Sequence, residues 1–125
     1  MLQYDALVAP AKEAWLELDE GERIGLVSEY HRDIGEELPE HERNLLHATM
    51  HVIVENQVAL ELLPVCQALE RLLRAGLDRH DAIHAIASVL AGQMHDLVAH
   101  GSSDINERYA EELHQLTAKG WRATK

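Results

Sequence analysis

The chain has 125 residues, 46% of them hydrophobic, and its 22 acidic residues against 11 basic ones give a formal charge of −11. The length predicts one domain, and the acidic charge argues against a nucleic-acid or anionic-membrane partner, because a phosphate surface would repel it. A lone cysteine, no long apolar stretch and no signal-peptide pattern at the N-terminus lead us to expect a cytoplasmic protein.

Apolar residues recur at helical spacing along the chain, and no segment alternates as a strand does. Proline and glycine positions divide this pattern into six predicted helices, at about 10–18, 22–34, 40–63, 64–77, 78–100 and 103–120. We therefore predict an all-α single domain over residues 1–125, a bundle of five to six helices. The last five residues are expected to be disordered.

Two histidine pairs suggest a chemical role. His47 and His51 are four residues apart, as are His80 and His84, so each pair projects from one face of its helix. Glu55 continues the first pair at the same spacing. Neutral imidazole is a common ligand for zinc and iron, and a catalytic zinc ion typically has three protein ligands and an open position for water.

A length argument predicts that the two pairs meet. If the third, fourth and fifth helices run up, down and up, the fourth descends roughly 20 Å at about 1.5 Å per residue. The fifth helix then begins near the level of Met50. This puts His80 beside His51 and His84 beside Glu55, with His47 about one turn below.

The candidate metal ligands are His47, His51, Glu55, His80 and His84. The leading hypothesis is a cytoplasmic protein that binds zinc or iron, with metal-activated water as the most economical chemistry if it is an enzyme. The alternative is a non-enzymatic interaction module, such as a homodimer that buries an aliphatic helix face. In that case the histidines are polar residues at the edge of the core.

The segment from His80 to His84 resembles the His-Glu-x-x-His signature of zinc hydrolases, with Asp81 in place of the glutamate. In that signature the glutamate acts as a general base toward metal-bound water. Aspartate is one methylene shorter, and Asp81 has a competing role in a capping box that begins at Asp78. Asp81 is therefore interpreted either as a base or as part of a helix cap.

The chain also resembles the hemerythrin-like diiron bundles. Two ligand pieces of that family match in order: His51 with Glu55, and His80 with His84. His31 on the second predicted helix takes the place of the family's lone histidine. The family's last piece, a histidine with aspartate five residues later, is absent, because His114 is followed by Lys119 at that spacing. This departure puts a complete diiron centre in doubt and leaves a mononuclear one open.

A third of the chain resembles a family of small bacterial helical proteins of unknown function. The family pattern is His-x-x-x-His-x-x-x-Glu-x-Gln followed by Arg-His-Glu-Ala-x-His. It is matched here by His47, His51, Glu55, Gln57, Arg79, His80, Asp81, Ala82 and His84, with aspartate replacing the second glutamate. The resemblance implies a related helical fold and a shared metal site, and implies no reaction.

Overall fold

The computed structural model describes residues 3–36, 40–100 and 105–124, without the side chains of residues 41, 42, 96, 99, 100, 105 and 106. Those residues form seven helices and no strand: α1 (Lys12–Glu17), α2 (Glu20–Asp33), α3 (His41–Ala59), α4 (Leu63–Arg74), α5 (Arg79–His100), α6 (Ile105–Gln115) and α7 (Ala118–Arg122). The all-α prediction is confirmed, and the predicted count of five to six helices is too low.

The extra helix lies at the C-terminal end. The expected sixth helix was to continue to Gly120, but α6 ends at Gln115 and Thr117 caps a new helix by accepting a hydrogen bond from the backbone of Gly120. Trp121, in the segment expected to be disordered, is 9% exposed and packs in the core as part of α7. The predicted start of the sixth helix, at Ser103 or Asp104, lies outside the described residues.

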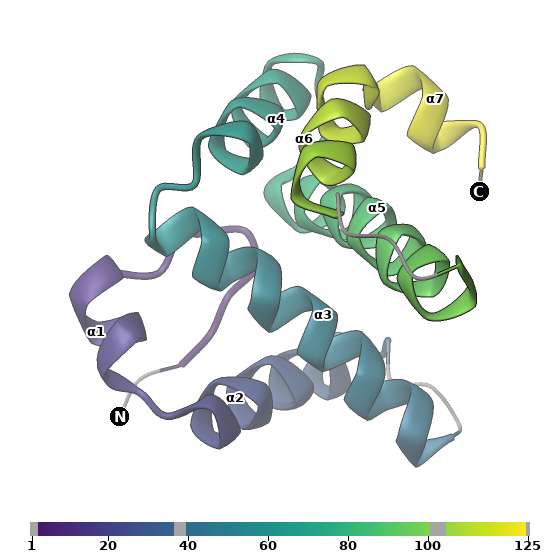
Figure 1. Ribbon diagram of the computed structural model, residues 1–125. Coiled ribbons are helices and arrows are strands. Elements are labelled where there is room, and N and C mark those ends of the chain that lie inside the picture. The colour runs from purple at the N-terminus through teal and green to yellow at the C-terminus, as the bar shows by residue number, and fades with distance from the viewer. Residues whose placement is uncertain (1–2, 37–39, 101–104, 125) are drawn as a thin grey trace.

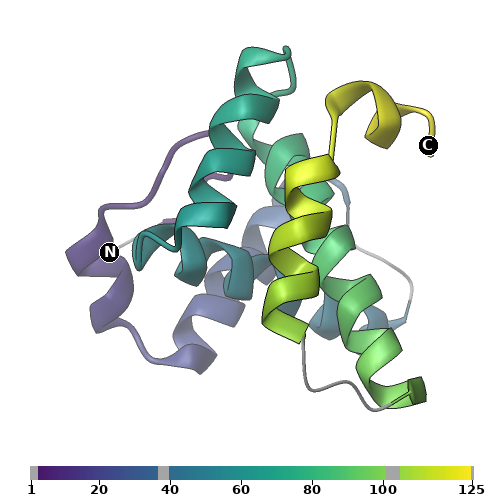
Figure 2. The ribbon, with the colours of Figure 1, turned by 45° about the horizontal axis from the view of Figure 1, so that its top comes forward.

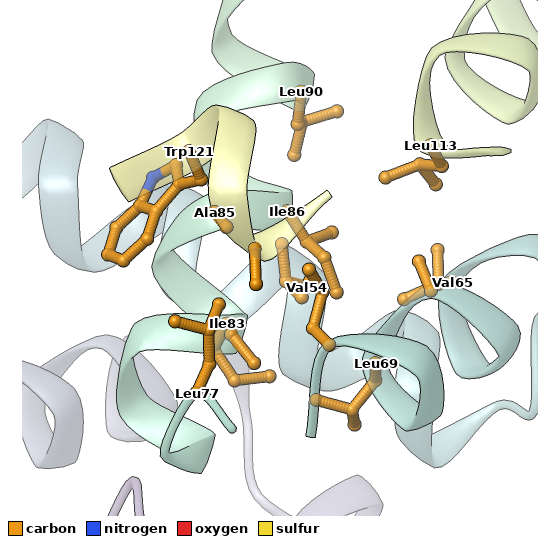
Figure 3. Packing of buried hydrophobic residues seen from close by; sticks show 14 of the residues in the cluster. Val54, Val65, Leu69, Leu77, Ile83, Ala85, Ile86, Leu90, Leu113 and Trp121 are labelled. Atoms are coloured by element: carbon orange, nitrogen blue, oxygen red, sulfur yellow. The ribbon is translucent and has the colours of Figure 1, made fainter. Parts of the chain in front are cut away.

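Helix α3 lies between α1 and α2 on one side and α4, α5 and α6 on the other (Figures 1 and 2). It contributes side chains to two apolar clusters. The larger cluster joins α3 to α4, α5, α6 and α7, and Figure 3 shows Val54 of α3 among residues such as Ile86 of α5. The smaller cluster packs the N-terminal segment, α1 and α2 against the other side of α3, with Trp15 almost fully buried. Helix α3 therefore packs against both α2 and α5.

The turn between α3 and α4 determines the direction in which α4 leaves α3. Helix α3 ends at Ala59 rather than near residue 63, Glu61 has a left-handed backbone with φ of 59°, and α4 leaves at 102° to α3. Helix α4 therefore does not descend alongside α3. No single helix among the described residues is long and apolar enough to cross a membrane, although α3 and α4 taken together as a bent pair pass that test.

Helix α5 consequently runs opposite to α3, which corrects the up-down-up expectation. Arg79, at the start of α5, contacts Glu55 near the end of α3, whereas His84, further along α5, contacts His47 near the start of α3. The predicted level of His84, beside Glu55, is therefore wrong, whereas His80 lies near His51 as predicted, with ring centroids 5.8 Å apart. The two histidine pairs still meet, because reversing the direction of α5 keeps the same stretches of both helices in contact.

Candidate metal centre

Three imidazoles from three helices meet at one point between α2, α3 and α5. The Nε2 atoms of His31, His47 and His84 are separated by 3.2, 3.2 and 3.1 Å, which makes an almost equilateral triangle. Zinc–nitrogen bonds are about 2.0–2.1 Å long, so a point about 1 Å above the plane of this triangle lies at bonding distance from all three nitrogens. The triangle has the size of one face of a metal coordination sphere.

His31 has the tautomer that a metal ligand requires, with its proton on Nδ1 and a free lone pair on Nε2. Its Nδ1 atom lies 2.8 Å from the carbonyl oxygen of Val27, one turn earlier in α2. A carbonyl only accepts, so Nδ1 carries the proton and Nε2 presents a lone pair to the triangle. Burial lowers the pKa of both His31 and His47 below the usual value, which favours the neutral imidazoles that bind metals.

His51 has a buried nitrogen without a protein partner. Its Nε2 atom lies 2.6 Å from the hydroxyl of Tyr4, and that hydroxyl donates its own proton to Glu55. His51 must therefore donate from Nε2 to Tyr4, which leaves a lone pair on Nδ1. Among the described residues this Nδ1 is the buried side-chain nitrogen with no hydrogen-bond partner, and burial holds the pKa of His51 well below its usual value.

Two groups of described side chains could hold a metal ion. In the first, one ligand atom from each of His31, His47, His51 and His84 lies within 4.8 Å of the others. The second joins His31 and His84 to His80 and to a carboxylate oxygen of Glu36. His80 approaches His84 to 3.0 Å between Nε2 atoms, and its Nε2 lies 3.6 Å from Glu36. Both groups share His31 and His84, so they describe one site with alternative outer ligands.

Glu55 has a different set of partners from the predicted one. Its carboxylate receives two hydrogen bonds of 2.7 Å from the guanidinium of Arg79 and a third from Tyr4. Glu55 does not belong to either group of candidate ligands found among the described residues. Arg79 also donates to the carbonyl of Ala6, 3.1 Å away. The position of Glu55 fits an orienting role, because it fixes Tyr4, which in turn fixes the tautomer of His51.

The structure thus brings together four of the five predicted ligands: His47, His51, His80 and His84. The fifth, Glu55, is linked to His51 through the hydroxyl of Tyr4. His31, a central member of the triangle, was indicated only by the hemerythrin-like pattern. Tyr4 and Glu36 were not anticipated, since a lone tyrosine and an exposed glutamate have no spacing that marks them. Asp78 accepts a 2.8 Å hydrogen bond from the backbone of Asp81, which confirms the predicted cap at the start of α5.

No protein-family model matches this chain, and neither a curated protein nor a solved structure matches it. The resemblances to small bacterial proteins and to hemerythrin-like bundles therefore stay predictions. The function has to be inferred from the side chains of the site.

Proposed function

We propose that this protein binds one divalent transition-metal ion, zinc or iron, through the imidazoles of His31, His47 and His84. The observation that carries the proposal is the triangle of Nε2 atoms 3.1–3.2 Å apart. A neutral imidazole has one proton, and on His31 that proton is already donated to Val27. Hydrogen bonds alone therefore cannot pair all three Nε2 atoms with one another, whereas a cation accepts a lone pair from each of them.

His51 and His80 are the proposed further ligands. His51 offers the unpartnered Nδ1 atom, whose burial without a partner costs about 1–3 kcal/mol and which an ion would relieve. The Nε2 atom of His80 lies 3.0 Å from Nε2 of His84 and 3.6 Å from a carboxylate oxygen of Glu36. Since His31 and His84 belong to both groups and each nitrogen has one lone pair to give, the proposal is for one ion, not two.

The proposed site leaves room for an exogenous ligand. Nitrogens 3.1–3.2 Å apart, at bonds of about 2.1 Å, subtend about 97° at the ion, nearer the octahedral than the tetrahedral angle. An ion with open positions lowers the pKa of bound water and would activate it for attack, which keeps metal-activated water as the proposed chemistry. No residue is assigned to a reaction.

Metal content measured on protein purified without an affinity tag tests this proposal. We expect about one equivalent of zinc or iron per chain. His84→Ala should remove the metal, whereas His114→Ala, which changes an exposed histidine on α6, should retain it. Circular dichroism checks that both variants are helical.

Thermal unfolding gives a second readout of the same proposal. A ligand that binds only the folded state at one hundred times its Kd adds about 2.7 kcal/mol of stability. Zinc or iron(II) should therefore raise the Tm of metal-free wild-type protein and of His114→Ala, and leave His84→Ala unchanged. If neither zinc nor iron(II) changes the Tm of the metal-free wild-type protein, the proposal is contradicted.

A second candidate function is a homodimeric interaction module without metal. It is favoured by three leucines exposed at the turn between α3 and α4: Leu60 at 67%, Leu62 at 44% and Leu63 at 64%. Exposed apolar side chains that cluster on one surface commonly mark an interaction site. Sedimentation equilibrium of wild type and of Leu60→Lys tests this candidate, which predicts a dimer that the substitution dissociates.

A further inference from the structure

An apolar groove of about 430 Å³ runs along the contact between α3 and α5 and ends at the candidate metal centre. Its described lining comes from both helices and includes Leu46, His47 and Met50 of α3 and His84, Ala87 and Ala91 of α5. His47 and His84 also form two corners of the imidazole triangle. A molecule in the groove would therefore touch the same side chains that hold the proposed ion.

The groove combines an apolar body with local positive charge. Leu46, Met50, Ala87 and Ala91 form the apolar surface, and no acidic side chain occurs among the described residues that line it. Arg43 is its cationic side chain, one helical turn before His47 and therefore on the same face of α3. Arg43 pairs with Glu40 at 3.3 Å, but both side chains are largely exposed, and such a pair is easily exchanged for another anion.

A second hollow, also lined by His47, has a different character. It measures about 90 Å³ and is lined by His31, His47 and polar side chains that include Ser28, Arg32 and Asn44. This space suits a few water molecules rather than an organic ligand. The site thus has a small polar approach and a larger apolar one.

We propose that the groove between α3 and α5 binds a small amphiphilic monocarboxylate, with its aliphatic chain along Leu46, Met50, Ala87 and Ala91. The carboxylate is attracted by Arg43 and by the proposed ion, so this inference rests in part on the proposed function. In a chain with a formal charge of −11, a groove with a cation and no acidic lining selects an anion. At roughly 30 Å³ per heavy atom, the groove of about 430 Å³ holds a ligand of about fourteen such atoms at most.

Calorimetric titration with octanoate tests the proposal on full-length protein whose metal content has been measured first. Octanoate should bind with one-to-one stoichiometry and at least ten-fold more tightly than acetate, which lacks the chain, or octan-1-ol, which lacks the charge. Arg43→Gln should weaken octanoate binding several-fold and leave octan-1-ol binding unchanged.

Two substitutions on α5 provide a matched pair. Ala91→Phe fills the groove from an exposed position and should weaken octanoate binding ten-fold or more without changing the metal content. Gly92→Phe adds the same ring one residue later, at a position where an added Cβ meets nothing within 4 Å, and this variant should bind octanoate as the wild type does. Equal affinities for octanoate in Ala91→Phe and wild type would overturn the proposal.

The experiment separates this proposal from the proposed function. Metal-free protein should still bind octanoate through the groove and Arg43, more weakly, and Ala91→Phe should still lose that binding. A protein that takes up no metal but shows this pattern contradicts the metal site and supports the groove. A metal-loaded protein that prefers octanoate over acetate by less than two-fold overturns the groove proposal alone. If Ala91→Phe instead dissociates a dimer, a second copy of the chain occupies the groove and the proposal is wrong.

Discussion

Two buried polar clusters lie within one or two helical turns of each other. They differ in how many of their buried polar groups have hydrogen-bond partners within the protein. Around Glu55, the guanidinium of Arg79 and the hydroxyl of Tyr4 match the carboxylate with three hydrogen bonds. Around His84, imidazole nitrogens face one another at 3.0–3.2 Å, and the nearby His51 has an unpartnered Nδ1. The polar groups of the first cluster are paired within the protein, whereas the second cluster presents imidazole lone pairs that the proposed cation would satisfy.

The largest expected effect comes from breaking the complete cluster. Arg79→Ala leaves the carboxylate of Glu55 buried without its countercharge, and breaking a buried pair in this way costs about 3–5 kcal/mol. The free energy of unfolding, measured by urea denaturation of metal-free protein, should fall by that amount. Arg74→Ala, which breaks an exposed pair with Glu70, is the control and should cost less than about 1 kcal/mol.

Removing a corner of the imidazole triangle should affect metal affinity far more than it affects the metal-free fold. We expect His31→Ala to abolish the gain in unfolding free energy on metal addition, which is about 2.7 kcal/mol at one hundred times the wild-type Kd. Glu36→Gln, at the half-exposed edge of the second group, should keep most of that gain. Similar losses in both variants would contradict the central place given to the triangle.

Tyr4→Phe tests the link between the two clusters. The substitution removes the hydroxyl that accepts from Nε2 of His51 and donates to Glu55, so the tautomer that exposes Nδ1 is no longer enforced. Loss of a partner that orients a ligand typically costs 10- to 100-fold in metal affinity. Competition with a chelating dye measures this change. Tyr109→Phe, which removes a hydroxyl bound to Gln57 away from the site, should leave metal affinity unchanged.

The smallest expected effect is a pH dependence of the metal-free protein. Burial lowers the pKa of His31, His47 and His51 below the ordinary histidine value of 6.5, so below about pH 6.5 the unfolded chain binds protons that the folded chain does not. The free energy of unfolding should therefore fall as pH drops from 7.5 to 5.5, above the range in which most carboxylates titrate. Urea midpoints at these two pH values provide the measurement, and a midpoint that rises toward pH 5.5 would contradict the neutral, buried state of these histidines.

The sequence alone was sufficient for the helical class and for singling out histidines that the structure brings together. Both signals are local: apolar residues at a period of 3.6 make a helix, and imidazoles four residues apart share a face wherever that helix lies. The cap at Asp78 was predictable for the same reason, since Asp78 and the backbone of Asp81 are three residues apart.

The direction of α5, the partners of Glu55 and the membership of the triangle were decided by tertiary structure. A short turn at Glu61 sends α4 away at 102°, and after a second turn at Gly76, where φ is 97°, α5 runs opposite to α3. Glu55 shares its helical face with His47 and His51, yet Arg79 and Tyr4, distant in sequence, take up its carboxylate. Helical period determines which side chains share a face, and only the packing of distant segments determines what each face meets.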